Sequence, residues 1–150
     1  MKKIFTLLVC ALSILSMILP VSASETGKTV YYSEEILDNG IVIISEVIDH
    51  SQARTGTKNY EHSKTYVRNG ITIGVVSIYG SFRYDGSSVS VLSKRVTQTD
   101  TYDGWNYSQT SFSSSGGTIT LSAKLTKPLN SSIPITMTLS CDANGNISYT

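Results

Sequence analysis

The chain has 150 residues, and its 12 basic and 11 acidic side chains leave a formal net charge of only +1. This balance disfavours nucleic acid and anionic membranes as partners, because both attract strongly basic proteins. Charged residues make up 15% of the chain, against about 25% in ordinary domains, so uncharged polar side chains must cover much of the surface.

The first 23 residues have the pattern of a secretory signal peptide. Two lysines precede the apolar run Ile4–Leu19, and Ala23 ends a stretch of small residues. The run is short for a bilayer span, and predicted cleavage after Ala23 removes it. We therefore expect a signal peptide, 1–23, and a secreted domain, 24–150, without stable membrane insertion after cleavage. Cys10 is not a lipid-attachment site, because Val9 stands where a lipobox needs a small residue.

The predicted mature segment contains 37 serine and threonine residues among 127. The two lysines removed with the signal peptide leave 10 basic and 11 acidic residues, a net charge near −1. The length suits one domain with a substantial core. Cys141 is the single cysteine left, so no intrachain disulfide forms, and its alternation with Met137 and Leu139 predicts a buried thiol.

The mature segment opens with a predicted hairpin. Val30–Leu37 and Ile41–Ile48 flank Asp38-Asn39-Gly40, a sequence suited to a tight turn. The polar stretch Asp49–Ser63 has no period, so we expect a long loop or a crossover between two sheets. Lys64–Arg68 then pairs with the next strand across Asn69-Gly70.

The longest predicted strand, Ile71–Tyr84, lies between Asn69-Gly70 and Asp85-Gly86, which are both hairpin turns. Its inward series is Ile71, Ile73 and Val75 in the first half, and Val76, Ile78, Phe82 and Tyr84 in the second. The change of parity predicts a bulge near Gly74–Val76. A straight strand of this length would be longer than a compact domain, so we expect it to bend and to serve two sheets.

The second half of the chain continues as short strands. They are predicted at Ser87–Thr97, Gly104–Phe112, Thr118–Thr126, Ile133–Cys141 and around Ile147 and Tyr149. Thr118–Thr126 alternates most regularly, and Pro134 suits the beginning or the edge of a sheet. No segment has a sustained helical period. The sequence predicts an all-β fold, an antiparallel β-sandwich that is immunoglobulin-like in general architecture, with a closed β-barrel as the alternative.

These segments resemble a group of small secreted β-rich proteins of Gram-positive bacteria (Firmicutes). The residues that carry the resemblance are turn and core residues: Leu37–Ile41, Tyr66, Asn69-Gly70, Gly80–Ser87, Gly104-Trp105, Ser115–Thr118, Leu139–Cys141 and Gly145. The resemblance covers essentially the mature chain. It implies export and a β fold, and it carries over no functional residue.

The sequence contains no zinc motif, nucleophile elbow or phosphate-binding glycine loop. We therefore predict no catalytic, metal or cofactor-binding residue. His50 follows Asp49 and His62 follows Glu61, an order in which a carboxylate could orient a base, but both histidines are expected to be solvated loop residues.

Two features could bind a ligand. The first is the aromatic cluster 102–107, whose rings could stack on sugars while Asp103 and Asn106 form hydrogen bonds with the sugar hydroxyl groups. The predicted ligand surface is Tyr102, Asp103, Trp105, Asn106 and Tyr107. For Trp105 the sequence favours the other interpretation, the core tryptophan of a sandwich, since tryptophan is mostly buried. In that case we expect its indole to cover Gly80, which interrupts an inward series. The second feature is the serine and threonine surface of residues 118–126 and 136–140, which polysaccharide or ordered water could contact, although threonine also simply suits a solvent-facing strand.

Three classes of function follow from the sequence. The first is a non-catalytic binding or adhesion module that acts on cell-wall polysaccharide, extracellular carbohydrate or protein, since surface is the main asset of such a domain. The second is a bacteriocin-like or interbacterial toxic protein, for which small size and export are suitable. The third is a secreted hydrolase that uses Asp103 or the histidines.

Overall fold

The structure, a computed structural model, describes residues 27–52, 56–129 and 131–150. The predicted signal peptide, its cleavage site and Cys10 lie outside these residues. The described residues contain nine strands and no helix, and therefore none that could span a membrane. The strands are β1 (Lys28–Ile36), β2 (Ile41–Asp49), β3 (Thr57–Arg68), β4 (Ile71–Tyr84), β5 (Val89–Thr101), β6 (Asn106–Ser115), β7 (Thr118–Lys127), β8 (Ser131–Cys141) and β9 (Ile147–Tyr149).

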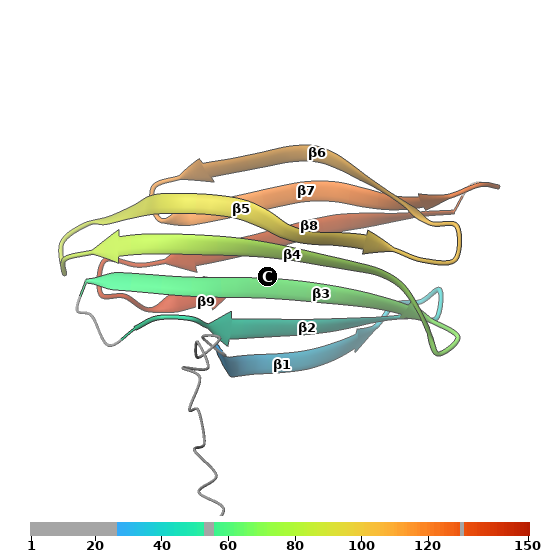
Figure 1. Cartoon of the computed structure of the whole chain (residues 1–150), viewed down its shortest axis with the longest axis horizontal. Coiled ribbons are helices and arrows are strands. Elements are labelled where there is room, and N and C mark those ends of the chain that lie inside the picture. Colours follow the sequence, from blue (N-terminus) through green and yellow to red (C-terminus); the bar gives the residue numbers. More distant parts are fainter. Residues whose placement is uncertain (1–26, 53–55, 130) are drawn as a thin grey trace, which may run out of the picture.

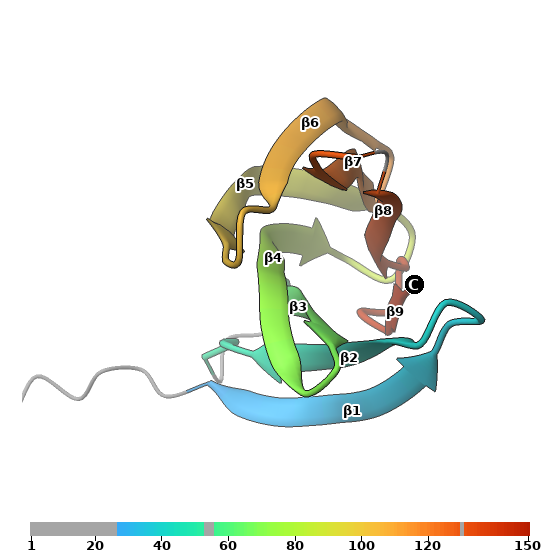
Figure 2. The ribbon, with the colours of Figure 1, turned by 90° about the vertical axis from the view of Figure 1, so that its right-hand side faces the viewer.

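Two antiparallel sheets pack face to face (Figures 1 and 2). The first has the order β1-β2-β3-β4-β5 and the second β6-β7-β8-β9, and they do not close into a barrel. The predicted β-sandwich is thus confirmed. Each sheet keeps the order of the sequence, because every strand joins its neighbour by a short turn that favours antiparallel pairing.

The predicted crossover at Asp49–Ser63 is wrong. β3 begins at Thr57 and pairs with both β2 and β4, so the connection is short and stays within the first sheet. The sequence of β3 shows no alternation of apolar and polar residues because polar residues occupy some of its inward positions, among them His62 and Lys64. Among the described residues, the chain passes between the sheets once, at 102–105.

β4 is one continuous strand of 14 residues and pairs only within the first sheet, so the expectation that it serves two sheets is also wrong. The expected bulge exists, close to the predicted place. Tyr66 pairs with Gly74 and Val67 with Thr72, which leaves Ile73 as the extra residue. The bulge places both Ile73 and Gly74 on the inner face, and Ile71, which pairs with Arg68 at the start of β4, lies at the end of the sandwich with 59% of its surface exposed. The predicted inward position is wrong for Val75, which lies between the inward residues Gly74 and Val76.

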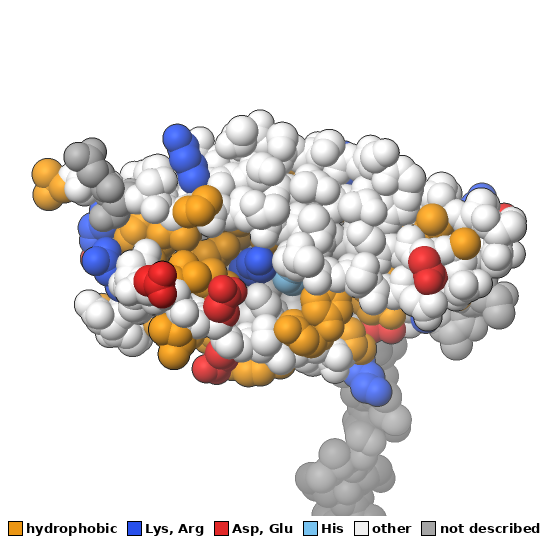
Figure 3. Space-filling model, turned by 180° about the vertical axis from the view of Figure 1, so that it is seen from behind, with side chains coloured by type: hydrophobic (Ala, Val, Ile, Leu, Met, Phe, Trp, Pro, Cys, Tyr) orange, Lys and Arg blue, Asp and Glu red, His pale blue; other side chains and the backbone are white. Residues whose placement is uncertain are grey.

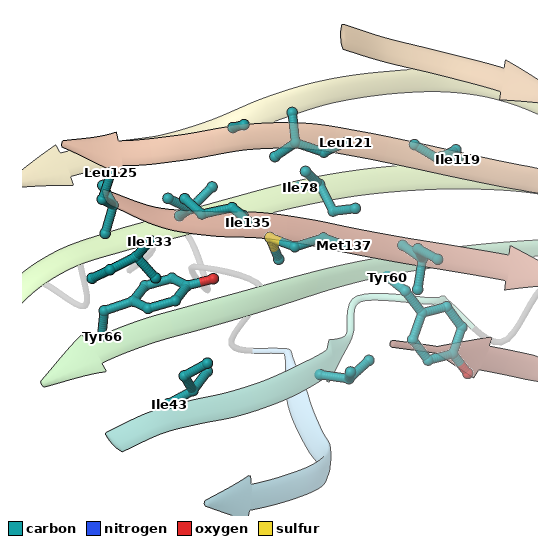
Figure 4. Packing of buried hydrophobic residues seen from close by; sticks show 14 of the residues in the cluster. Ile43, Tyr60, Tyr66, Ile78, Ile119, Leu121, Leu125, Ile133, Ile135 and Met137 are labelled. Atoms are coloured by element: carbon teal, nitrogen blue, oxygen red, sulfur yellow. The ribbon is translucent and has the colours of Figure 1, made fainter. Parts of the chain in front are cut away.

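The core lies between the sheets and is filled mainly by alternate residues of β4, β7 and β8 (Figure 4). Six inward residues of β7 and β8 are at most 1% exposed: Ile119, Leu121 and Leu125 in β7, and Ile135, Met137 and Leu139 in β8. Cys141 continues this inward series and is 4% exposed, which agrees with its predicted position.

Two glycines of β4 receive side chains from the facing sheet. A Cβ atom added to Gly80 would lie 2.6 Å from Cδ1 of Ile119, and one added to Gly74 would lie 2.8 Å from Cδ1 of Leu125. The predicted cover of Gly80 by Trp105 is wrong, because β7 already supplies the residue that fills this space. Trp105 is instead buried near the opposite end of β4, beside Ile73.

Lysine side chains close both edges of the second sheet. β7 pairs with almost the whole of β8 on one side, whereas β9 pairs only with Leu139–Cys141 on the other, so most of that outer edge of β8 has no strand beside it. Lys64 of β3 donates a hydrogen bond to the carbonyl oxygen of Thr136 in β8, at 3.0 Å. At the other edge, Lys94 of β5 donates to the carbonyl oxygen of Phe112 in β6, at 3.2 Å. Inward-pointing charges of this kind keep other strands from joining an edge.

Candidate functional site

A pocket lies at the end of the sandwich where the β3–β4 and β5–β6 turns meet, the right-hand end of Figure 1. Its volume is about 220 Å³. The residues that line it come from both sheets: Arg68, Asn69, Ile71, Ile73, Asp103, Trp105 and Lys127. We call it the Trp105 pocket.

The backbone of the two turns fixes the polar residues of the Trp105 pocket. Asn69 and Asp103 have φ angles of 52° and 54°, and each precedes a glycine that also has a positive φ. Asparagine and aspartate tolerate this left-handed conformation, which tight turns with two central residues of positive φ require. The amide of Tyr102 donates to the carbonyl oxygen of Ile73 at 3.2 Å and ties the second turn to β4.

The walls of the Trp105 pocket combine apolar and charged groups. Trp105 is 4% exposed and Ile73 is 1% exposed, so these two side chains form a rigid apolar base. On the rim, Lys127 Nζ lies 2.7 Å from Asp103 Oδ2. The side chain of Arg68 is exposed and makes no hydrogen bond or ion pair with the described residues. A small amphipathic ligand could thus rest on apolar surface while its polar groups meet the rim.

The structure separates the five residues of the predicted ligand surface. Asp103 and Trp105 line the pocket, Trp105 as a buried core residue. Tyr102 is 48% exposed and Asn106 is exposed, but neither lines the pocket. Tyr107 is half-buried against the core, where burial raises its pKa. The cluster is therefore not one continuous stacking surface.

Sequence reasoning missed Arg68, Asn69 and Lys127. In a sheet that follows the order of the sequence, every second turn lies at the same end. The two Gly-containing turns Asn69-Gly70 and Asp103-Gly104 are separated by two strands, so their proximity could have been inferred. Lys127, just before Pro128, ends β7, which is the second strand after the Asp103-Gly104 turn, so it lies at the same end of the sandwich.

Neither histidine pairs with the acid immediately before it in the sequence. Glu61 and His62 are successive residues of β3 and point to opposite faces. His62 is 1% exposed, and its Nδ1 donates to the carbonyl oxygen of Thr138 at 3.2 Å, so the expectation of a solvated loop residue is wrong. Burial, with the nearby charge of Lys64, lowers the pKa of His62 to about 4 despite that hydrogen bond. His62 is thus a neutral core residue.

His50 does meet a carboxylate, although from another strand. Its Nε2 lies 3.3 Å from Glu61 Oε2, and Arg95 stacks on the neighbouring Tyr79 ring at 4.1 Å. The hydroxyl of Thr97 donates to Glu61, and no hydroxyl of the described residues donates to His50. A histidine activates a nucleophile by accepting its proton, so this arrangement provides no activated hydroxyl.

The serine and threonine surface is a regular array. Ser113, Thr120 and Thr138 form one row across β6, β7 and β8, and Ser111, Ser122 and Thr136 form the next. Figure 3 shows the corresponding side of the molecule as largely uncharged above a region of hydrophobic and charged side chains. Some of the hydroxyls are satisfied by each other, as in the 2.9 Å bond from Ser140 to Thr118.

Among residues 27–52, 56–129 and 131–150, no group of three or more His, Cys, Asp or Glu side chains could hold a metal ion. Comparisons with protein-family models, with curated proteins and with solved structures found no match. The resemblance to small secreted proteins of Gram-positive bacteria thus stays a prediction.

Proposed function

We propose that the protein is a secreted, non-catalytic binding module that holds extracellular or cell-wall carbohydrate in the Trp105 pocket. The proposal rests on the observation that one pocket is lined by a buried tryptophan and by four polar or charged residues: Trp105, Asp103, Asn69, Arg68 and Lys127. An apolar base with a few converging polar groups is typical of small-ligand sites.

The chemistry of the rim favours a sugar. Asp103 can accept hydrogen bonds from hydroxyl groups, while the Asn69 amide both donates and accepts. A volume of about 220 Å³ is below the range of about 300–1,000 Å³ for drug-sized ligands, so the pocket would take one ring of a longer chain. The rest of the glycan would extend over the exposed residues beside the pocket, including Tyr102.

Export belongs to the same proposal and rests on the sequence of residues 1–23 and on the resemblance to secreted proteins of Gram-positive bacteria. The protein would be released after cleavage following Ala23. N-terminal sequencing of protein recovered outside the cell should begin at Ser24. Recovery of intact Met1 in a membrane fraction would contradict the localisation.

Binding can be tested by pull-down on purified peptidoglycan and by a glycan array, followed by titration of each positive glycan. Trp105 is the single tryptophan of the chain, so its fluorescence reports on the pocket directly. We expect Asp103→Asn and Lys127→Ala to weaken binding. Lys124→Ala is the matched control, because Lys124 is an exposed lysine of the same strand outside the pocket.

The proposal predicts that glycan binding changes the Trp105 emission and is weakened by the pocket variants alone. Binding that is unaffected by both pocket variants would move the site elsewhere on the surface. Retention of no glycan by the wild-type protein would contradict the carbohydrate-binding function.

A further inference from the structure

The charges of the Trp105 pocket do not balance. Asp103 is neutralised by Lys127 at 2.7 Å. The described residues supply no such partner for Arg68, which leaves one uncompensated positive charge at the pocket. An unpaired guanidinium beside an apolar base is a binding group for an anion that enters with its own apolar surface.

The backbone holds Arg68 firmly, although its side chain is exposed. Arg68 is the last residue of β3 and pairs with Ile41 of β2 on one side and with Ile71 of β4 on the other. It therefore projects from the end of the central strand of the first sheet, and the Asn69-Gly70 turn follows immediately. Groups carried on strands are positioned more precisely than groups on loops.

We propose that the Trp105 pocket selects sugar rings that bear a carboxylate, and that Arg68 binds this carboxylate. The inference rests on the proposed function and names its ligand class. Arginine presents parallel N–H groups that match the two oxygens of a carboxylate, whereas lysine offers a single point charge. Lys127 is already occupied by Asp103, so Arg68 is the group available for this role.

Asp103 sets the orientation of the ring. Its carboxylate would repel a second carboxylate placed beside it, so the acidic group of the sugar must lie on the Arg68 side. The hydroxyl groups would then face Asp103, which accepts their hydrogen bonds. A neutral sugar would leave Arg68 without a partner and would lose the charge-assisted bonds.

The experiment compares ligands that differ only in the carboxylate. Trigalacturonic acid and its methyl ester test an extracellular polyuronate, while N-acetylmuramic acid and its methyl ester test a wall-derived sugar. Each is titrated into wild type, Arg68→Gln, Arg68→Lys and the control Arg83→Gln. Arg83 is an exposed arginine near the other end of β4. Circular dichroism confirms that each variant is folded.

We expect at least one acid to bind roughly tenfold or more tightly than its neutral partner, a difference of about 1.4 kcal/mol or more, because hydrogen bonds between charged groups are stronger than neutral ones. Arg68→Gln should abolish this difference, Arg68→Lys should retain part of it, and Arg83→Gln should leave it unchanged. Added salt should weaken binding of the acid more than that of its neutral partner.

Equal affinity of acid and neutral partner for the wild-type protein, or an acid preference that survives in Arg68→Gln, would overturn the role of Arg68 but leave carbohydrate binding intact. The role of Arg68 would also be overturned if the protein bound no member of either pair while the glycan array identified neutral glycans as ligands. If the wild type binds no glycan at all, both proposals fail.

Discussion

Ile119 of β7 packs directly onto Gly80 of β4. A Cβ atom added to this glycine would lie 2.6 Å from Cδ1 of Ile119 and 2.8 Å from Cε2 of Phe82. Both neighbours are fully buried, so neither can move into solvent. The two sheets approach each other closely here because β4 offers no side chain at this position.

Gly80→Ala should therefore destabilise the protein. Core overpacking costs typically 1–3 kcal/mol, and we expect a loss of about that size in urea unfolding. Ser81→Ala is the control, since Ser81 is half-buried and adjacent. The double variant Gly80→Ala, Ile119→Val should lose less stability than the sum of the two single changes, because the valine lacks the clashing Cδ1 atom. Strict additivity would show that Ile119 does not cause the clash.

The sequence anticipated the role of Gly80 but not its partner. Alternation along β4 identified an inward glycine with room above it, because periodicity tells which face a residue occupies. It does not tell how two sheets are aligned. Size alone favours Trp105 as the residue above Gly80, whereas the alignment of β7 on β4 brings Ile119 to this position.

The Trp105 pocket could likewise be predicted from the sequence only in part. Asp103 and Trp105 were identified within a local aromatic cluster, and both line the pocket. Arg68 and Lys127 lie far from that cluster in the sequence and were missed, because a pocket formed by several turns depends on the complete strand order. The strand β3 itself was recognised only in part, since His62 and Lys64 interrupt its apolar alternation.

The free energy of unfolding should decrease as the pH is lowered, because His62 is buried in its neutral form. Its pKa is lowered from 6.5 to about 4 in the folded protein, mainly by burial. The unfolded chain therefore binds more protons between these two values, and the contribution is complete above about pH 6.5 and lost as pH falls towards 4. At about 1.4 kcal/mol per pKa unit, the loss is on the order of 3 kcal/mol.

The measurement is chemical unfolding of wild type and His62→Gln at several values between pH 7 and 4.5. Glutamine keeps an amide that can donate to the Thr138 carbonyl but does not titrate. We expect the stability advantage of the wild type over the variant to shrink, or to reverse, as pH falls. A constant difference between the two proteins across this range would show that His62 is not the titrating group.

Cys141 should be unreactive in the folded protein. It is 4% exposed, and burial together with the nearby charge of Asp142 raises its thiol pKa, against the opposing effect of Lys58. Because the thiolate is the reactive species, a thiol reagent should label Cys141 only after unfolding in denaturant. Rapid labelling of native protein, or a disulfide-linked dimer on a non-reducing gel, would contradict its burial.

Lys64 should keep the protein monomeric. Its side chain bonds to the Thr136 carbonyl on the uncovered part of β8, so Lys64→Ala would leave this carbonyl available to a strand of another molecule. We expect more self-association of the variant in light scattering at increasing concentration. Lys124→Ala removes the same charge from the outer face and serves as the control. Equal association of the two variants would mean that net charge, and not edge protection, is responsible.

Trp105 should be structural and also report on the pocket. Its indole is 4% exposed, so we expect a short-wavelength emission maximum that iodide hardly quenches. Trp105→Ala should cost about 3–5 kcal/mol, the range for a large aromatic core residue. Tyr102→Ala removes an exposed ring from the same turn, and we expect it to change stability by less than about 0.5 kcal/mol. Strong iodide quenching of the native protein would mean that the indole faces solvent, and Trp105 would then become a candidate for direct stacking on a sugar.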